Sequence, residues 1–491
     1  MLAAFSTAPV FTAQAIYALE QQLRGVSEDS WWLIRKAGEA LADHIQQQWP
    51  QESPVAIFCG PGNNGADGYY AAKVLHARGV EVQLVWVGGA GHHVSQHQYA
   101  QEQCTIPVID AQVALRTARL IVDAILGNGA RAQALPVAMV QVVQAINAAG
   151  LPILAVDLPT GVTDTGGVQE VAIKAHHTMA FIGYRLAHVT GVAVDYCGQV
   201  VLNSLGVDVT QAPSLATLLI RQTGALFSPR QLSAHKGTQG HVLVVGGDKG
   251  MGGAALLAGS AALHGGAGKV TVLTQEAHVA SFLVRQPEIM VHGVTANTDI
   301  SPWLAKADAV VLGPGLGRQP WGRALAQQAL LAPCPLLCDA DGLYWLDACN
   351  DLKRPHATVV TPHPGEAATL LNRKTAWVQT HRRQALESLM NKTQAVVVLK
   401  GNGTMVSREE AGPLVLGCGN PGMAVAGMGD VLSGVIGALL AQGMPAEHAA
   451  TLGAWWHSYT ADVLAQQQGE VALLPTKVIA ALKETWSNAR S

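Results

Sequence analysis

The feature that most constrains the fold is a pattern repeated along the chain, in which a short apolar run ends in glycine, aspartate or proline and a helical stretch follows. In the first half the apolar runs cover residues 55–59, 82–87, 120–123, 153–157, 177–182 and 199–202, with helical stretches such as 67–78 and 137–149 between them. Strand, turn and helix in this order are typical of a parallel, doubly wound sheet. Because parallel strands end at one edge of the sheet, we expect the functional loops to gather there.

The same pattern begins again in the second half, after a break near residues 206–223. Apolar runs then cover residues 241–245, 269–273, 309–312, 335–339, 358–361 and 395–400, and helical stretches close the chain at 430–442 and 448–464. A chain of 491 residues is too long for one hydrophobic core. The sequence therefore predicts an α/β protein of two domains, with residues 1–215 in a Rossmann-like doubly wound domain and residues 225–491 in a second α/β domain.

Composition argues against several classes of function. Only 13% of the residues are charged, the net charge is −3, and there is no long basic run, so neither a nucleic acid nor an anionic membrane is an expected partner. The 7 cysteines are odd in number and scattered, which fits a reducing compartment better than a disulfide framework. The sequence shows neither a signal-peptide pattern nor an apolar run long enough to span a bilayer, and we expect a cytoplasmic protein.

A glycine-dense loop runs from Gly417 to Gly429 and ends at Asp430, where an apolar helix is expected to begin. Backbone N–H groups at such a loop and at a helix N-terminus form an anion site. A carboxylate placed there would repel phosphate. We therefore interpret Asp430 as a base that takes a proton from a hydroxyl group while the N–H groups hold a phosphoryl group. The alternative is that Asp430 only caps the helix.

A second glycine loop, from Gly60 to Gly68, follows a strand, opens a helix and contains the spacing G-x-G-x-x-G. A hydride-transfer Rossmann site would also place an acid at the end of the second strand, whereas Glu81 stands at its start. The loop carries Asn63 and Asn64 instead, and their amides favour specific hydrogen bonds or oxygen donation to a cation. A hydride-transfer Rossmann site is the alternative at this point.

Two further strand ends of the first half carry acids. Asp123 precedes a glycine turn, and Asp157 precedes the run Leu158-Pro159-Thr160-Gly161. Oxygen atoms of Asn64, Asp123 and Thr160 could together hold a hard cation, which would leave Asp157 for acid–base work. The alternative is that strand-end aspartates cap the turns that follow them.

Three motifs of the first half carry a family resemblance: Gly62-Asn63-Asn64-Gly65-Ala66-Asp67-Gly68, Asp123-Ala124-Ile125-Leu126-Gly127 and Val156-Asp157-Leu158-Pro159-Thr160-Gly161. They resemble the NAD(P)H-hydrate epimerase family. The resemblance implies a Rossmann-like fold, a potassium ion at Asn64, Asp123 and Thr160, and Asp157 as the catalytic residue that interconverts two epimers at C6 of a hydrated nicotinamide ring. It also implies substrate contacts at Asn63, Asn64, Gly65, Ala66, Asp67, Gly127, Asn128, Gly129 and Asp157.

Three departures from that family's pattern stand in the sequence. Ala66 replaces a glycine that is usual there, and Thr160 replaces a serine but keeps the hydroxyl group. Tyr184-Arg185-Leu186-Ala187 stands where Leu-Lys-Pro-Gly is common, so Arg185 keeps the positive charge but not the geometry. We expect these changes to affect the efficiency of an epimerase more than its presence.

Motifs of the second half carry another resemblance. Thr361-Pro362-His363-Pro364-Gly365-Glu366 holds a histidine between prolines, Lys400 ends a predicted strand before a glycine turn, and His235-Lys236-Gly237 opens the domain. With the loop before Asp430, they resemble the ribokinase-like superfamily and, within it, the ADP/ATP-dependent NAD(P)H-hydrate dehydratase family, over roughly residues 230–485. The resemblance implies substrate contacts at Ala254, Gly317, His363 and Asp430. It implies nucleotide contacts at Lys400, Gly401, Asn402, Gly403, Thr404 and Gly429.

Together the two resemblances imply a bifunctional repair enzyme for hydrated NADH and NADPH. The first domain would epimerise the R and S forms, and the second would dehydrate the S form at the expense of ADP, giving AMP and phosphate. The expected cofactors are K⁺ for the epimerase and Mg²⁺ with ADP for the dehydratase, and the chain is expected to form a homo-oligomer. The alternative is a ribokinase-like small-molecule kinase with a non-catalytic N-terminal binding module.

Overall fold

The computed structural model describes residues 2–26, 31–88, 95–127, 134–227, 230–348 and 354–488. The chain divides into two compact units, each described here by itself. The N-terminal unit comprises Ala8–Ala216 with Gln379–His381, and the C-terminal unit comprises Met1–Thr7, Thr217–Val378 and Arg382–Ser491. The boundary between Ala216 and Thr217 lies close to the expected one, but the sequence did not reveal that the first seven residues belong with the second half.

The N-terminal unit is built on a 6-stranded sheet with the order β3-β2-β4-β5-β6-β7, in which neighbouring strands pair in parallel. The strands are β2 (Val55–Cys59), β3 (Val82–Trp86), β4 (Leu120–Ala124), β5 (Ile153–Val156), β6 (His177–Phe181) and β7 (Gln199–Asn203). They confirm the Rossmann-like doubly wound prediction. The residues of β2, β4 and β5 are buried throughout, as expected for strands covered on both faces.

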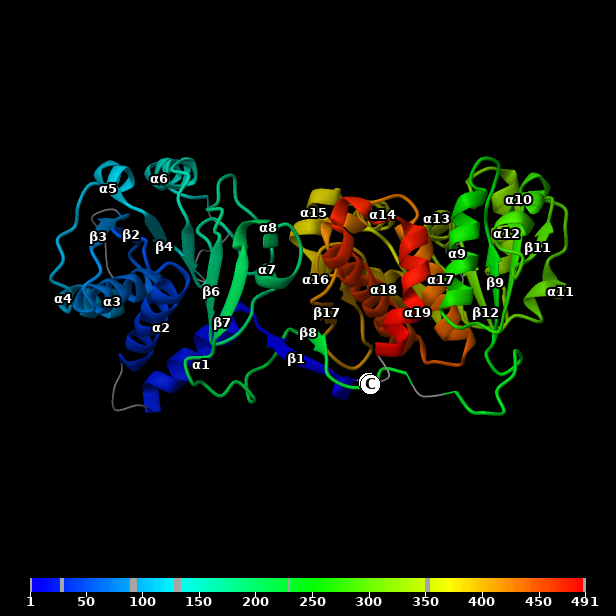
Figure 1. The fold of residues 1–491 in the computed structure, drawn as a ribbon, viewed down its shortest axis with the longest axis horizontal. Coiled ribbons are helices and arrows are strands. Elements are labelled where there is room, and N and C mark those ends of the chain that lie inside the picture. Colours follow the sequence, from blue (N-terminus) through cyan, green and yellow to red (C-terminus); the bar gives the residue numbers. More distant parts are fainter. Residues whose placement is uncertain are drawn as a thin grey trace. The chain divides into compact units, whose positions relative to one another are not determined.

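Helices cover both faces of this sheet (Figure 1). Buried side chains of α2 (Trp32–Gln48) and α3 (Asn63–Ala77) belong to one apolar core, and those of α5 (Ala111–Thr117) and α6 (Val137–Ala148) belong to the other. The remaining helices are α1 (Ala13–Val26), α4 (Ser95–Glu102), α7 (Leu186–Val189) and α8 (Val194–Cys197). Helix α3 begins four residues before the expected position at residue 67, so the asparagine pair lies in its first turn.

The C-terminal unit contains an 11-stranded sheet with the order β1-β8-β17-β16-β15-β14-β13-β12-β9-β10-β11. Its strands are β1 (Phe5–Val10), β8 (Ala216–Gln222), β9 (His241–Val245), β10 (Lys269–Thr274), β11 (Met290–Gly293), β12 (Ala309–Leu312), β13 (Leu336–Cys338), β14 (Thr358–Val360), β15 (Val396–Leu399), β16 (Met405–Val406) and β17 (Leu414–Leu416). Strands β9 to β15 pair in parallel, and β16 pairs with β15 and β17 in antiparallel fashion. The break expected near 206–223 is wrong in part, because β8 lies inside it and pairs with β17.

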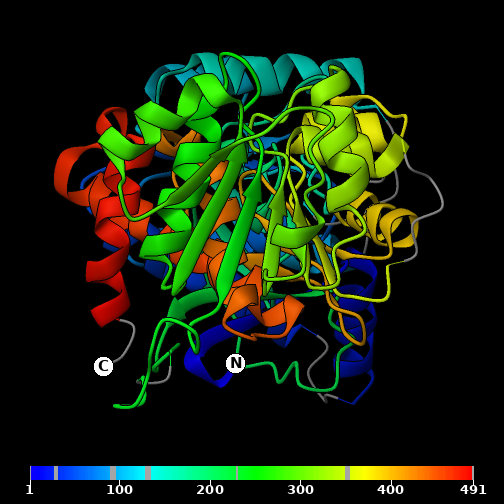
Figure 2. The ribbon, with the colours of Figure 1, turned by 90° about the vertical axis from the view of Figure 1, so that its right-hand side faces the viewer.

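Layers of helices sandwich this sheet, with α9, α17, α18 and α19 on one face and α12 and α13 on the other (Figures 1 and 2). The helices are α9 (Gly252–His264), α10 (Val279–Arg285), α11 (Ser301–Leu304), α12 (Pro320–Ala329), α13 (Asp341–Ala348), α14 (Pro364–Leu370), α15 (Thr375–Thr380), α16 (Arg382–Thr393), α17 (Met428–Ala441), α18 (Ala446–Gln468) and α19 (Pro475–Asn488). Within the described ranges, no helix is both long and apolar enough to cross a membrane.

Helix α17 is buried almost all round, which fits its uniformly apolar sequence. Two glycines let it approach its neighbours closely. A Cβ atom at Gly434 would lie 2.1 Å from the Ala258 carbonyl oxygen on α9, and one at Gly437 would lie 2.4 Å from a methyl carbon of Val311 in β12. The middle of α17 is therefore fixed against both α9 and the sheet, and the first turn of the same helix carries Asp430.

Candidate active sites

Asp430 lies in the first turn of α17, but it does not cap the helix. The cap position is held by Gly427, whose φ of 91° is in the left-handed region that favours glycine. A Cβ atom there would also meet Leu257 at 2.6 Å. The capping alternative is therefore wrong, and Asp430 stands among the first N–H groups of the helix, as the anion-site interpretation expects.

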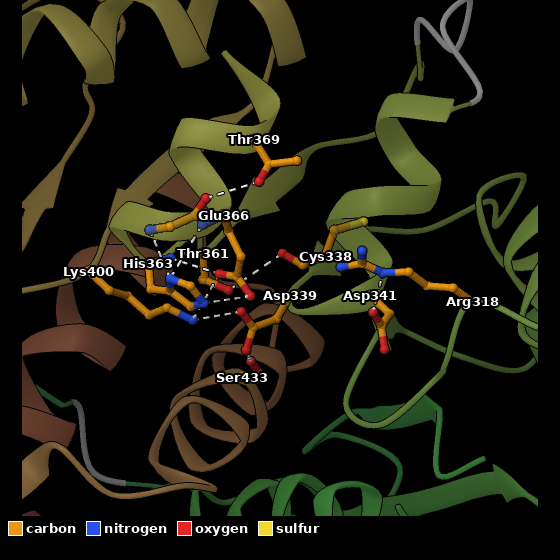
Figure 3. Close-up of polar contacts among 11 residues, drawn as sticks. Arg318, Cys338, Asp339, Asp341, Thr361, His363, Glu366, Thr369, Lys400 and Ser433 are labelled. Atoms are coloured by element: carbon orange, nitrogen blue, oxygen red, sulfur yellow. Dashed lines mark hydrogen bonds and ion pairs between the residues drawn. The ribbon is translucent and has the colours of Figure 1, made fainter. Parts of the chain in front are cut away.

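Lys400 and Asp339 form a buried ion pair beside this helix start (Figure 3). The Lys400 Nζ atom lies 2.8 Å from Asp339 Oδ1, and the Ser433 hydroxyl donates to Asp339 Oδ2 at 2.7 Å. Asp339 follows β13, Lys400 follows β15, and Ser433 lies on α17. A Cβ atom at Gly429 would come within 3.3 Å of Nζ and 3.4 Å of Asp339 Oδ2, so glycine allows the helix start to approach the pair.

His363 and Glu366 complete the polar cluster from α14. Glu366 accepts the backbone N–H of His363 at 2.8 Å, and the His363 ring accepts the N–H groups of Gly365 and Glu366 at 3.0 and 3.3 Å. Glu366 also lies 3.8 Å from Lys400 Nζ. His363 therefore caps α14 with Nδ1, while its side chain remains 55% exposed and available to a ligand.

Burial and neighbouring charges shift the pKa values of this cluster. Burial raises the pKa of Asp430 to about 7; the carboxylates of Asp339 and Glu366 add to the rise, and Lys400 opposes it. Burial also raises the pKa of Glu366, against the effect of Lys400. For Lys400 burial acts in the opposite direction, but the nearby carboxylates prevail and raise its pKa, so the ammonium group stays charged.

The turn after Lys400 is held by Arg382, a residue that the sequence analysis did not identify. Arg382 is 1% exposed and donates to the carbonyl groups of Leu399, Lys400 and Gly403 at 2.9 to 3.4 Å. Gly401 has a φ of 128°, which lets the chain turn there. The expected nucleotide contacts from Lys400 to Thr404 thus form one anchored turn, and no sequence motif marked an arginine eighteen positions earlier as its support.

The backbone at Gly317 is anchored by Asp341, the first residue of α13. Asp341 accepts the backbone N–H of Gly317 at 3.0 Å and pairs with Arg318 at 2.9 Å (Figure 3). The preceding loop lies against the start of α9, since a Cβ atom at Gly315 would meet that of Ala254 at 3.2 Å. The structure thus places two of the expected substrate contacts, Ala254 and Gly317, on adjoining segments.

The loop before Asp430 is tied to α18 by Asp462, which the sequence analysis also missed. The backbone N–H of Gly419 and the amide of Asn420 donate to the Asp462 carboxylate at 2.8 and 2.7 Å. Because Asp462 lies more than forty positions along the chain, only the tertiary fold brings it to the loop.

In the N-terminal unit, Asp123 and Thr160 meet at the carboxyl edge of the sheet. The Thr160 hydroxyl and backbone N–H donate to the two oxygens of Asp123 at 2.7 and 2.8 Å. Asp123 is fully buried, and this burial raises its pKa to about 6 despite those hydrogen bonds and another from the Ile125 N–H group. Among the described residues, the groups that donate to this carboxylate are neutral.

Asn64 lies beside this pair. Its amide nitrogen donates to the Val156 carbonyl at 2.7 Å, and a Cβ atom at Gly127 would lie 2.2 Å from its Oδ1. Ala66 is fully buried, and a side chain at Gly65 would clash with the Gly60 carbonyl at 1.8 Å. Asn128 and Gly129 lie outside the described residues.

A cavity opens next to the same edge of the sheet. Its lining includes Asn63, Asp67, Phe181 and Ile182, together with Glu20 from α1. Two of the expected substrate contacts, Asn63 and Asp67, therefore face one cavity. Phe181 links that cavity to Asp157, because its backbone N–H donates to the Asp157 carboxylate at 3.4 Å.

Asp157 follows β5 and has a φ of 61°, which is unusual for a residue other than glycine. Arg185 Nη2 lies 3.4 Å from its Oδ1, and both side chains are buried. The guanidinium group also donates to the Gly183 carbonyl. The two residues singled out as the catalytic acid and as a departure from the family pattern are therefore direct partners.

Comparison with known proteins agrees with both halves. A family model described as NAD(P)H-hydrate dehydratase matches residues 242–484, and one described as the YjeF-related protein N-terminus matches residues 31–187. The bifunctional NAD(P)H-hydrate repair enzyme of Coxiella burnetii is 39% identical over 94% of this chain and 95% of its own, and that of Escherichia coli is 37% identical over 92% and 88%. A crystal structure of the ADP/ATP-dependent NAD(P)H-hydrate dehydratase of Bacillus subtilis, co-crystallized with ATP and Mg²⁺, has a TM-score of 0.50 and 27% identity, covering 54% of this chain and 94% of that one.

The fold and the sites define a two-domain α/β enzyme whose second half carries Asp430 among the first N–H groups of a buried helix. Both domains of the known bifunctional enzymes are present in this chain. The chain belongs to the bifunctional NAD(P)H-hydrate repair enzyme family. This membership confirms the resemblance to the NAD(P)H-hydrate repair enzymes, and it disfavours the single-function kinase alternative.

Proposed function

We propose that this chain epimerises the R and S forms of hydrated NADH and NADPH in its N-terminal unit and dehydrates the S form with ADP in its C-terminal unit. The observation that carries the proposal is the position of Asp430. Its carboxylate stands at the start of a buried helix, beside charged Lys400 and with a pKa raised to about 7. A base of that pKa is matched to proton transfer near neutral pH.

In the dehydratase site, Asp430 takes the proton of the C6 hydroxyl group while that oxygen attacks the terminal phosphoryl group of ADP. The O–P bond forms as the bond to the leaving AMP breaks. Lys400 and the N–H groups at the start of α17 stabilise the charge that develops on the phosphoryl oxygens. The ring nitrogen lone pair then expels phosphate from C6, and loss of a proton from the ring restores NAD(P)H. Phosphorylation makes the departing oxygen a good leaving group, which explains the use of a nucleotide.

In the epimerase site, Asp157 is the residue placed to move a proton at the C6 hydroxyl group. Phe181, which lines the cavity, donates its backbone N–H to the Asp157 carboxylate, and Arg185 lies 3.4 Å from that carboxylate. The substrate contacts proposed around it are Asn63, Asn64, Gly65, Ala66, Asp67, Gly127, Asn128 and Gly129. Because the dehydratase uses one epimer, an epimerase in the same chain lets the whole pool of hydrate be repaired.

The donor set of Asn64, Asp123 and Thr160 fits a potassium ion. All three offer oxygen atoms, and Asp123 is a fully buried carboxylate that, among the described residues, contacts only neutral groups. A bound monovalent cation would supply the missing positive charge and hold the phosphate or hydroxyl groups of the substrate.

Mg²⁺ is proposed to enter the second site as the complex with its nucleotide. Within the described ranges, no group of three or more His, Cys, Asp or Glu side chains is suited to hold a metal ion. The protein therefore contributes charge and backbone donors to the nucleotide, at Lys400, Gly401, Asn402, Gly403, Thr404 and Gly429.

We further propose a homo-oligomer in a reducing cytoplasm, which sedimentation of the purified chain and thiol titration would test.

One assay tests the proposed function. Mixed epimers of hydrated NADH are incubated with the full chain and either ADP or ATP, and the absorbance band of reduced nicotinamide is followed. Full recovery with release of AMP and phosphate is expected. Asp157→Asn should leave the R epimer behind, and Asp430→Asn should stop recovery altogether. A stable phosphorylated product, or a near-full rate for Asp430→Asn, would contradict the proposal.

A further inference from the structure

A buried histidine, His188, links Asp157 and Arg185 in the proposed epimerase site. His188 lies in α7 and is 4% exposed. Its Nδ1 accepts the backbone N–H of Arg185 at 3.0 Å, and since an amide N–H can only donate, the ring proton is on Nε2. Nε2 then donates to the backbone carbonyl oxygen of Asp157 at 2.7 Å. One side chain therefore bridges the backbone at both residues.

The backbone of Asp157 needs such support. A φ of 61° costs an aspartate about 1 kcal/mol or more and persists where the surroundings hold it. The direction of the carboxylate depends on this turn, and it brings the group 3.4 Å from both Arg185 Nη2 and the Phe181 N–H. A change in the backbone angles of this turn would shift the carboxylate relative to both partners.

The bridge requires an uncharged ring, because a doubly protonated imidazole has no acceptor for the Arg185 N–H. Burial lowers the pKa of His188 to about 4; Asp157 opposes this shift and Arg185 adds to it. His188 is therefore neutral wherever the enzyme is assayed. Both ring nitrogens are already used, so the ring has no free site for proton exchange with a substrate.

We propose that His188 is a positioning residue of the epimerase, which holds the left-handed turn at Asp157 and the start of the Arg185 segment in register. The inference rests on the proposed epimerase function. Its role is to fix where the Asp157 carboxylate points, and a displacement of about 1 Å at a reacting group can lower a rate by roughly a hundredfold.

The test compares two variants of the full chain. His188→Leu removes both hydrogen bonds, whereas the amide of His188→Gln keeps a donor and an acceptor. The epimerase rate is measured with excess full-chain Asp157→Asn as the source of dehydratase, by the slow phase in which the R epimer is consumed. We expect His188→Leu to lower kcat by about tenfold to a hundredfold with KM changed less than about twofold, and His188→Gln to restore most of the rate.

Matched controls separate positioning from general loss of structure. His44→Leu changes another buried histidine of the same unit, whose Nε2 lies 3.1 Å from His177 Nδ1 at the opposite end of β6. It should leave the epimerase kcat unchanged. Dehydratase activity in the same chain normalises the enzyme concentration, and thermal unfolding by near-ultraviolet circular dichroism shows that the N-terminal unit is folded during the assay.

Each outcome is decisive. If the wild type epimerises and folded His188→Leu keeps its kcat, or if glutamine and leucine are equally slow, the inference fails while the proposed function stands. If the wild type does not epimerise, both fail. Should His188→Leu unfold at the assay temperature, His188→Asn, whose shorter amide cannot span both backbone groups, replaces it in the same comparison.

Discussion

The pH dependence of the dehydratase should be set by the ion pair next to Asp430. With a pKa of about 7, Asp430 is ionised in about one molecule in ten at pH 6, so kcat/KM should fall roughly tenfold per pH unit below neutrality. After burial, the Asp339 carboxylate is the largest cause of this raised pKa, and Lys400 opposes it. The two members of one ion pair therefore act on the base in opposite directions.

Substituting each member should accordingly move the acid limb of the profile in opposite directions. Asp339→Asn removes a like charge and is expected to shift the limb to lower pH. Lys400→Met removes the compensating charge and should shift it to higher pH, with a lower plateau because Lys400 also contacts the phosphoryl group in the proposed mechanism. The assay is kcat/KM for the S epimer with saturating ADP between pH 5 and 9. Shifts of the same sign, or an unchanged limb in both variants, would refute the reasoning.

Other consequences follow from the two sites. Asp430→Asn should raise the thermal unfolding midpoint more at pH 8 than at pH 5. The raised pKa makes the folded state hold a proton that the unfolded chain releases, so stability falls as pH rises from about 4 to 7; scanning calorimetry at both pH values checks the sign. Gly127→Ala should abolish epimerisation and spare dehydration, since its Cβ would lie 2.2 Å from Asn64 Oδ1. Thr160→Val should lower the free energy of unfolding by about 1–3 kcal/mol, because buried Asp123 loses a hydroxyl donor, whereas Thr160→Ser should be near neutral in a urea titration.

The strand-end motifs could be predicted because their signal is local. An apolar run that ends in aspartate places Asp123 and Asp157 at a known edge of a parallel sheet, and a glycine-dense loop before an apolar helix places Asp430 at a helix start. Family resemblance then supplied their roles. The positions of the two proposed bases and of the glycine turns were accessible from the sequence for this reason.

The supports of these sites were not accessible, because their contacts join distant segments. Arg382, Asp462 and His188 stand in stretches with no motif, and each acts on backbone groups that only the tertiary fold brings near. Strands β1 and β8 were missed for a related reason. No helix stands among the described residues between β8 and β9, and the partners of both β1 and β8 are far away in the sequence.

Strand β1 has a consequence for how the chain is made. It lies at the edge of the large sheet next to β8 (Figure 1). The ring of Phe5 packs edge-on against that of Trp455, with the ring centroids 5.3 Å apart. The carbonyl of Ala4, just before the strand, accepts the N–H of Thr223 at 2.8 Å. During synthesis this first segment must wait for partners that the ribosome adds much later. A fragment that begins after the first domain would lack an edge strand and expose the apolar surface around Trp455, so a gene for the second half alone would not encode a complete sheet.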